Sequence, residues 1–156
     1  MSMERARSHL QKYGLEDRIQ EFTESSATVA LAAERLGVEP ARIAKSLSFL
    51  VDGEAILVVA AGDVKVDNSK FKARFRTKAK MLTPDQAEQM VGHSVGGVCP
   101  FGVEPGVRVY LDESLRRFST VFPAVGTAAS AIELMIPELE QASEAAAWVD
   151  VCKTAG

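Results

Sequence analysis

Two segments of this sequence carry residue types that could act on a carbonyl or a phosphate group. Residues 96–102 read Gly-Gly-Val-Cys-Pro-Phe-Gly, and Lys45 begins an apolar, strand-like run. Glycine adopts positive φ and admits a close neighbour, whereas proline fixes φ and has no N–H. Such a loop can hold backbone N–H groups in fixed directions, which suits a carbonyl oxygen or a phosphate. Many tight turns have the same composition, so the loop alone leaves both interpretations open.

Lys45 is the cation nearest to such chemistry. Pro40 suits the first turn of a short helix before it, and Ser46 and Ser48 follow it at alternate positions. A lysine ammonium offers three hydrogen-bond donors and a full positive charge to a cleft. A lysine on an edge strand more commonly keeps its ammonium in water. The residue types therefore leave two alternatives open: the Lys45 ammonium binds a ligand in a cleft, or it is solvated at the surface.

Three segments together resemble the YbaK family, which shares its fold with the editing domain inserted in bacterial prolyl-tRNA synthetases. They are the Lys45 segment (residues 36–47), the 96–102 loop, and Gly126-Thr127 followed by Glu133-Leu134, Pro137 and Leu139. The resemblance covers roughly residues 25–152. With the length of the chain, it implies one editing-like domain over residues 1–156, in which residues 1–24 form a helical lead-in.

The resemblance implies roles for the two segments. Family members depend most on the lysine at this position, so Lys45 is expected to bind the terminal adenosine phosphate or the ester of an aminoacyl-tRNA. The loop would present N–H groups to the aminoacyl carbonyl, which adds Gly96, Gly97 and Pro100 to the catalytic group. Negative charge develops on that oxygen as water attacks, so preset donors favour the transition state. The expected substrate-binding residues are Thr28, Ser46, Val98, Cys99, Gly126 and Thr127.

Other polar residues are predicted to lie outside the chemistry. A nucleophilic Cys99 would need a nearby base to form the thiolate. His93 stands six residues earlier, and we expect it on the surface near a helix end at Gly92. Glu133 is expected to face solvent from a strand, and Asp67 to cap the next helix. No general base stands out, which fits the substrate-assisted reaction implied by the resemblance.

The sequence departs from the family around the amino-acid pocket. Some members have an aromatic residue before the lysine, where this chain has Ala27, Thr28 and Val29. An acidic position of the cysteine-clearing members is Ala131 here. Small pocket residues separate neighbouring substrates by only ~1–3 kcal/mol per methylene, so the amino acid stays open.

Composition limits the classes of protein. The chain has 156 residues, of which 47% are hydrophobic and 25% charged, as in one globular domain. No apolar stretch approaches the ~20 residues of a membrane helix, and the polar N-terminus does not resemble a secretory signal. Two cysteines and two histidines are too few for a disulfide framework or a zinc site. We therefore expect a cytoplasmic protein with no metal, cofactor, membrane or DNA partner.

Positive charge is concentrated in one segment. Residues 65–80 contain seven basic residues and one acid, a charge of +6, which leaves −9 for the rest of a chain whose net charge is −3. Six of these cations fall on every second position: Lys70, Lys72, Arg74, Arg76, Lys78 and Lys80. A solvated basic face is one interpretation. With the resemblance, an RNA-binding surface for the tRNA acceptor end is the other.

The local patterns predict an α+β fold. Strands are expected at 45–51 and 54–61, joined by the hairpin dipeptide Asp52-Gly53, and at 107–111, 119–124 and 128–136. Helices are expected from Ser25 or Ser26 to Gly37, over 68–74 before a strand, from Thr83 to Gly92, over 112–118, and from Pro137 to about Ala146. Short, hairpin-linked strands favour a mixed, largely antiparallel sheet. The family fold, a curved and partly closed barrel flanked by helices, agrees.

These observations predict a trans-editing hydrolase. It would deacylate a mischarged aminoacyl-tRNA bearing a small amino acid, with tRNA-Pro as one candidate. Lacking an anticodon reader, it would select its tRNA through the acceptor stem or through a docked aminoacyl-tRNA synthetase. The alternative is a non-catalytic module of the same fold that binds a nucleotide, an aminoacyl ligand or RNA.

Overall fold

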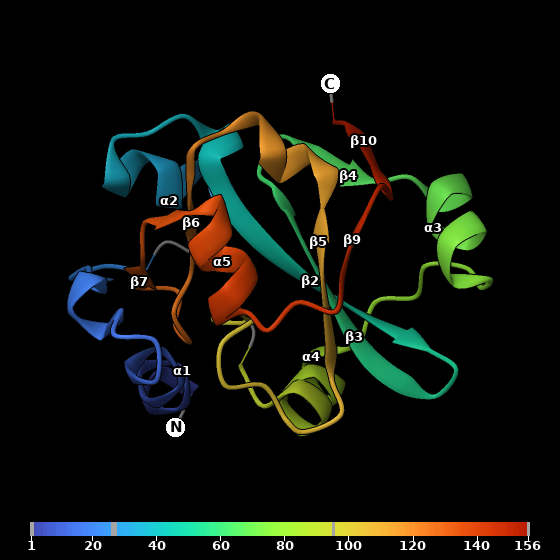
Figure 1. Cartoon of the computed structure of the whole chain (residues 1–156), viewed down its shortest axis with the longest axis horizontal. Helices are drawn as coiled ribbons and strands as arrows, with labels where there is room; N and C mark the ends of the chain where they lie inside the picture. The colour runs from blue at the N-terminus through green and yellow to red at the C-terminus, as the bar shows by residue number, and fades with distance from the viewer. Residues whose placement is uncertain (1, 26–27, 95, 156) are drawn as a thin grey trace.

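A mixed six-stranded sheet is the framework of the computed structural model, which describes residues 2–25, 28–94 and 96–155 (Figure 1). The strands follow the order β8-β6-β2-β3-β5-β9. They are β2 (Ile43–Val51), β3 (Glu54–Ala61), β5 (Arg108–Asp112), β6 (Thr120–Pro123), β8 (Leu134–Met135) and β9 (Ala147–Val149). Two short pairs lie outside this sheet: β1 (Gln20–Glu21) with β7 (Ser130–Ala131), and β4 (Val64–Val66) with β10 (Cys152–Thr154).

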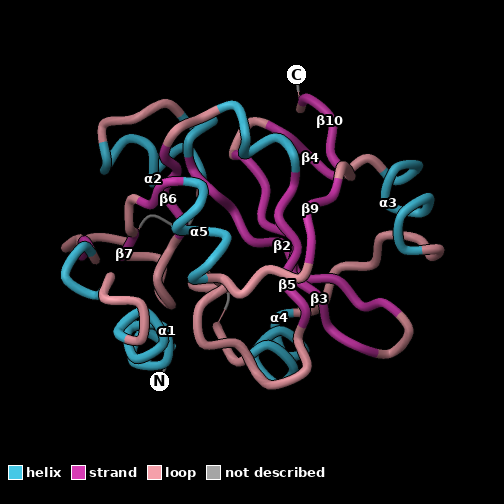
Figure 2. Tube along the Cα trace, viewed as in Figure 1, coloured by secondary structure: helices cyan, strands magenta, loops and turns pink. Residues whose placement is uncertain are grey.

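The predicted α+β class with a curved, partly closed sheet is confirmed (Figure 2). Four of the seven strand pairings among the described residues are antiparallel, namely β2–β3, β6–β8, β1–β7 and β4–β10. The other three, β2–β6, β3–β5 and β5–β9, are parallel. The flanking helices are α1 (Ser2–Gln11), α2 (Val29–Leu36), α3 (Asn68–Phe75), α4 (Pro84–Gln86) and α5 (Ile136–Ala142).

The β2–β3 hairpin is the central feature of the sheet. Asp52 and Gly53 both have positive φ, 52° and 79°, as the predicted two-residue turn requires. Every residue of β3 from Ala55 to Ala61 is buried, because both its faces are covered and both its edges are paired. The hairpin therefore holds β2, which carries Lys45, against the main core.

Helix termini follow local chemistry in most places. Asp67 caps α3 by accepting from the backbone N–H of Lys70, and Thr83 and Gln86 form the predicted capping box at α4. The helix continues through Ala87–Val91 to Gly92, whose φ is 98°. The predicted cap of α2 is wrong. Thr28, not Ser25, accepts from Leu31 at its start, because Thr28 immediately precedes the first helical turn with extended dihedrals; Ser26 lies outside the described residues.

Three other predictions of secondary structure are wrong for reasons of packing. Residues 76–80 form no strand: Arg76 is left-handed, with φ 64°, and ends the helix that buries Phe71 and Phe75. The strand expected over 128–136 is divided because β7 pairs with β1 whereas β8 pairs with β6. The C-terminal helix ends at Ala142, and residues 147–149 become β9 alongside β5.

Short helical turns connect the remaining strands. They are η1 (Glu16–Arg18), η2 (Pro40–Arg42), the π-helical η3 (Ala87–Val91) and η4 (Glu113–Arg117). As predicted, Pro40 opens η2 before β2, and Asp112 caps η4 by accepting from the Ser114 N–H. Over the ranges that the structure describes, no helix is long and apolar enough to cross a membrane.

Candidate active site

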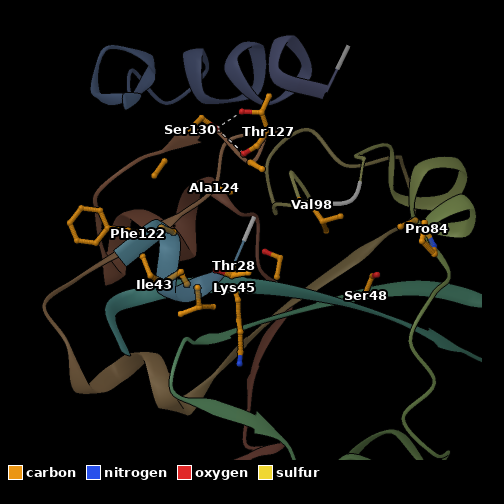
Figure 3. A pocket seen from close by; sticks show the side chains of 18 of the residues that line it. Thr28, Ile43, Lys45, Ser48, Pro84, Val98, Phe122, Ala124, Thr127 and Ser130 are labelled. Atoms are coloured by element: carbon orange, nitrogen blue, oxygen red, sulfur yellow. Dashed lines mark hydrogen bonds between the residues drawn. The ribbon is translucent and has the colours of Figure 1, made fainter. Parts of the chain in front are cut away.

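A cavity of about 290 Å³ lies between α2, strand β2, the start of α4 and the glycine-proline loop (Figure 3). Its floor is β2, where Ala44, Ser46 and Ser48 share one face because alternate residues of a strand point the same way. Segment 124–131 closes another side with Ala124, Thr127 and Ser130. Five segments of the sequence therefore meet at one cavity.

One end of the cavity is apolar. Val29, Ala32 and Leu36 come from α2, and they pack on a small buried cluster of Ala33, Ile43 and Phe122 that is separate from the main core. Alanines continue this wall at positions 124, 128 and 131. The short side chains leave room for a small aliphatic group.

Two serine hydroxyls form the polar part of the floor. Within the described residues, neither Ser46 nor Ser48 has a side-chain hydrogen bond, although the Ser48 side chain is largely buried at 7% exposure. Because both side chains line the cavity, their hydroxyls are available to a ligand. By contrast, the Thr28 hydroxyl oxygen accepts from Leu31, and Thr127 donates to Ser130 at 3.1 Å.

Lys45 contributes its stem to the cavity but directs its ammonium elsewhere. Figure 3 shows the side chain extending away from Thr28, Val98 and Thr127. The ammonium donates to the backbone carbonyl of Val64 in β4. Burial lowers the pKa of Lys45, and the nearby Cys152 and Asp63 partly oppose that shift. The structure therefore brings the lysine stem and the loop together, but not the ammonium and the loop.

The glycine-proline loop reaches the cavity with Gly96 and Val98. Gly96 has a φ of 90°, which favours glycine, and the described residues offer no hydrogen-bond acceptor to the N–H of Gly96 or Val98. The N–H of Gly97 already donates to the Ser94 carbonyl at 3.0 Å. Gly97 instead packs against the Gly126 carbonyl, so closely that a Cβ would collide with it.

The sequence-predicted residues fall into two groups. Thr28, Lys45, Ser46, Gly96, Val98 and Thr127 line the cavity. Gly97, Cys99 and Pro100 of the loop, and Gly126 behind it, are buried and do not line the cavity. Sequence reasoning did not assign Ser48, although its spacing from Ser46 was visible; Phe122 and Ala32 gave no local signal, because only the packing of α2 brings them here.

Burial decides the roles of Cys99 and His93. Cys99 is fully buried, which raises its pKa to about 12 and keeps it a thiol. The prediction of a surface His93 is wrong, since this side chain is completely buried. Gly92 turns the chain inward, and both ring nitrogens of His93 find partners, Ser2 at 2.6 Å and Phe101 at 2.8 Å. Glu133 is exposed as expected, and it accepts from Thr120 at 2.7 Å.

The basic segment does not form one row. α3 carries Lys70, Lys72 and Arg74 around a helix, where every second position does not share a face. Lys70 pairs with Asp150 at 3.0 Å, and Arg74 stacks on the Phe75 ring. Figure 1 places α3 at the opposite end of the molecule from α2. Arg76, Lys78 and Lys80 are exposed on the segment that leads back to Met81 at the cavity.

Within the described ranges, no group of three or more histidine, cysteine, aspartate or glutamate side chains could hold a metal ion. The lining of the cavity likewise contains neither carboxylate nor imidazole. The site can therefore offer backbone N–H groups, hydroxyls and an apolar wall. It offers a ligand no acid or base from its own lining other than the lysine.

Comparison with known proteins identifies related chains. The model of the family described as the aminoacyl-tRNA editing domain matches residues 23–142. The uncharacterized protein YwhH of Bacillus subtilis (strain 168) is 51% identical over 154 residues, 98% of each chain. The proline–tRNA ligase of Geobacillus kaustophilus (strain HTA426) is 33% identical over 94 residues, 60% of this chain but 17% of the ligase. A crystal structure of a proposed trans-editing enzyme for prolyl tRNA synthetase superimposes with a TM-score of 0.87 at 27% identity, covering 97% of each chain.

Proposed function

Because the chain belongs to the aminoacyl-tRNA editing domain family, we propose that it acts in trans, hydrolysing the ester of a tRNA charged with a wrong, small amino acid. It is an aminoacyl-tRNA deacylase related to prolyl-tRNA synthetase. The observation that carries the proposal is the cavity, whose lining brings together Gly96 and Val98 of the loop with Ser46 and Ser48 of β2; among the described residues, the N–H groups of the first two and the hydroxyls of the last two have no hydrogen-bond partner. A volume of about 290 Å³ is at the small end of the range for ligand pockets, which is consistent with a small group such as an aminoacyl end.

The loop would stabilise the reacting carbonyl. Water adds to the ester carbon, the carbonyl oxygen gains negative charge, and the Gly96 and Val98 N–H groups donate to it. The bond from carbon to the ribose oxygen then breaks, and that oxygen takes a proton. Since the lining holds no carboxylate or imidazole, the proton passes through water or a ribose hydroxyl of the substrate. In this reaction the protein mainly positions the substrate and polarises its ester carbonyl.

Ser46 and Ser48 would hold the substrate on the floor of the cavity. Their hydroxyls can each donate one hydrogen bond and accept others, which suits the amino group and the ribose of an aminoacyl end. The apolar wall of Val29, Ala32 and Phe122 would contact the amino-acid side chain. Larger side chains would meet this wall, so the pocket favours small ones.

In the proposed reaction, the Lys45 ammonium would leave its hydrogen-bond acceptor, the Val64 carbonyl oxygen, for an oxygen of the substrate. The ammonium is desolvated, donates to the Val64 carbonyl, and sits on a four-carbon stem that already lines the cavity. Because Lys45 alternates with Ala44 and Ser46, its ammonium lies on the face of β2 away from the cavity; to bind a phosphate oxygen of the acceptor end it would leave Val64 and pass the edge of β2 beyond the pairing with β6.

The tRNA would bind through its acceptor end. Lys78 and Lys80 are exposed on the chain that leads to Met81, at the rim of the cavity, and their charge suits a phosphate backbone. The other cations of the basic segment, on or beside α3, would contact more distant phosphates. We place the reaction in the cytoplasm, where tRNA is charged, with a docked synthetase as the source of tRNA selection.

The test is a deacylation panel. tRNA-Pro and other tRNAs carrying alanine, serine, cysteine, threonine, proline or phenylalanine are incubated with wild-type protein and with the Ser46→Ala/Ser48→Ala double variant. We expect wild type to release a small amino acid faster than phenylalanine, and the double variant to release it more slowly. If folded wild type released no amino acid but bound the charged tRNA, the chain would be a binding module and the proposal would be wrong.

A further inference from the structure

Helix α1 lies directly against the back of the glycine-proline loop. A Cβ on Gly126 would stand 2.5 Å from the Ser2 carbonyl oxygen, and one on Gly102 would stand 2.6 Å from that of Arg5. Gly97 in turn presses on Gly126. The helix, the segment at Gly126 and the loop thus form three layers with no room for side chains between their backbones. Helix α1 lies outside residues 23–142, which the family model matches.

His93 joins these layers through both ring nitrogens. Its Nε2 lies 2.8 Å from the carbonyl oxygen of Phe101, which can only accept, so Nε2 carries the proton. Its Nδ1 is then an acceptor, and the Ser2 hydroxyl at 2.6 Å donates to it. The ring therefore spans from the first turn of α1 to the residue that follows the Gly96–Pro100 loop.

The surroundings keep this histidine neutral. Burial lowers the pKa of His93, and the nearby Arg5 of α1 lowers it further, against the opposing effect of the Phe101 carbonyl. Arg5 is itself tied to the same region, because its Nε donates to the Gly102 carbonyl at 2.6 Å and its guanidinium pairs with Glu104. The Cys99 sulfur, 3.6 Å from Nε2, remains a thiol because burial raises its pKa to about 12.

We propose that His93 is a positioning residue for the deacylase: it ties α1 to the two ends of the loop and so sets the direction of the Gly96 and Val98 N–H groups. This inference rests on the proposed function. His93 and Phe101 flank the Gly96–Pro100 part of the loop, so the hydrogen bond from Nε2 of His93 to the Phe101 carbonyl joins the two ends of that part. N–H groups that stabilise a developing charge must be held within a few tenths of an ångström, so a support behind the loop matters for the rate.

His9, which belongs to α1 itself, provides a control for the loss of a histidine that holds this helix. Its Nε2 lies 2.6 Å from the carbonyl oxygen of Ala142 in α5, away from the loop. Both histidines therefore tie α1 to a backbone carbonyl, but only His93 forms a hydrogen bond with the loop segment; the His9 ring packs against the Phe101 ring, with centroids 6.3 Å apart. If both histidines only hold α1 in place, substitution of either should lower the stability of the protein and nothing else. If His93 also positions the loop, its substitution should lower the rate of deacylation as well.

The kinetic test compares His93→Ala, His93→Gln and His9→Ala. Glutamine can place an N–H near the position of Nε2 and keep the bond to Phe101. We expect His93→Ala to lower kcat by about a hundredfold with little change in KM, since a displacement of about 1 Å has that effect. His93→Gln should recover most of the rate, and His9→Ala should keep it. Equal losses in His93→Ala and His9→Ala, or an unchanged kcat in folded His93→Ala, would overturn the proposal.

A second measurement does not depend on activity. Nitrogen-15 NMR of the imidazoles should show His93 neutral, with its proton on Nε2, and the Ser2→Ala variant should perturb Nδ1. A proton on Nδ1 would overturn the bridge even if the enzyme is active. If instead the bridge is present and wild type deacylates no tRNA, the proposed function fails and the structural bridge stands.

The pH profile adds a further readout. His93 has a lower pKa in the folded than in the unfolded chain, so the unfolded chain binds the extra proton first. As pH falls from about 6.5 towards the lowered pKa, the free energy of unfolding should therefore decrease. Protonation of Nδ1 removes the acceptor for Ser2, so kcat should fall on the acid side. His93→Gln should lack this acid limb; an identical limb in that variant would contradict the role.

Discussion

Ser46 and Ser48 present the clearest pair of functional side chains. Both lie on the cavity face of β2, and the residues that the structure describes leave both hydroxyls without a partner. Neither hydroxyl is sealed inside the fold, since Ser46 is half-buried and both side chains line the cavity. The pair is therefore open to a ligand, and the proposed function gives it the aminoacyl end as that ligand.

For Ser48→Ala we expect a loss of kcat/KM of about tenfold, the effect of one hydrogen bond of ~1–1.5 kcal/mol. The free energy of unfolding should stay within ~0.5 kcal/mol of wild type or rise, since no folded-state hydrogen bond is removed. Steady-state deacylation and urea unfolding measure the two quantities. Ser8→Ala, at an exposed position of α1, is the control, and equal activities of the two variants would contradict a ligand-binding Ser48.

Lys45 can be tested for a structural or a functional role by one substitution. Lys45→Met keeps the length of the stem and removes the half-buried charge, whose pKa is lowered by burial. We expect deacylation to fall at least about a hundredfold while stability changes by less than ~1 kcal/mol, since a desolvated charge with a single carbonyl partner adds little to folding.

The same variant has an outcome that would reverse this interpretation. A marked loss of thermal stability with retained deacylation would mean that the bond to Val64 secures β4, and that the ammonium never leaves it. Lys65→Met, which removes an exposed lysine of β4, controls for the general loss of a positive charge.

At the scale of elements, the site depends on close backbone contacts between loops and α1. The loop at Gly97 can approach Gly126, and Gly126 can approach Ser2, only because none of the contacts includes a Cβ. These backbone contacts support the loop on the side away from the cavity, and β2 positions the two serine hydroxyls on its floor. Glycine therefore serves two purposes here: its missing Cβ lets backbone segments approach closely, and its positive φ lets the chain turn.

Gly126→Ala should destabilise the protein by ~2–3 kcal/mol and lower kcat, because the new Cβ meets the Ser2 carbonyl and the residue keeps a φ of 75°. Gly106→Ala is the matched control: its φ is 92°, and a Cβ there meets no atom within 4 Å. It should show only the cost of positive φ, ~1 kcal/mol, with unchanged kcat. Thermal unfolding and deacylation distinguish them, and equal effects would refute the contribution of these backbone contacts.

At the scale of the whole molecule, charge is distributed unevenly. The basic segment spans α3 and the chain that returns to the cavity, while the remainder of the protein is acidic. Some of this charge is already neutralised, since Lys70 pairs with Asp150. The chain at Lys78 and Lys80 is therefore the most direct path for a phosphate backbone towards the cavity.

Reversal of that charge should weaken tRNA binding. In Lys78→Glu/Lys80→Glu we expect KM for charged tRNA to rise about tenfold, with kcat retained, and the dependence of KM on salt to become shallower. Lys12→Glu/Lys65→Glu is the control, because it also reverses two exposed lysines, one in the turn after α1 and one in β4, outside the chain at Lys78 and Lys80. Kinetics at several salt concentrations provide the measurement; an equal rise in KM in both variants would indicate only a general effect of charge.

The sequence by itself determined the features that depend on neighbouring residues. The Asp52-Gly53 turn, the caps at Asp67 and Thr83, and the ends at Gly37 and Gly92 all follow from backbone preferences within a few residues. The family resemblance belongs here too, since it rests on short segments and is confirmed by the match over residues 23–142. The predictions of turns, caps and helix ends are correct because the interactions that stabilise these features join residues close together in the sequence.

Only the tertiary structure decided which side chains share a space. The burial of His93, the turn of the Lys45 ammonium towards Val64, and the pairing of β9 with β5 each depend on partners many residues away. No local pattern contains those partners, and a polar side chain is buried or exposed according to whether the fold supplies its hydrogen bonds. For His93 the fold supplies both, from Ser2 and Phe101, and burial follows from that.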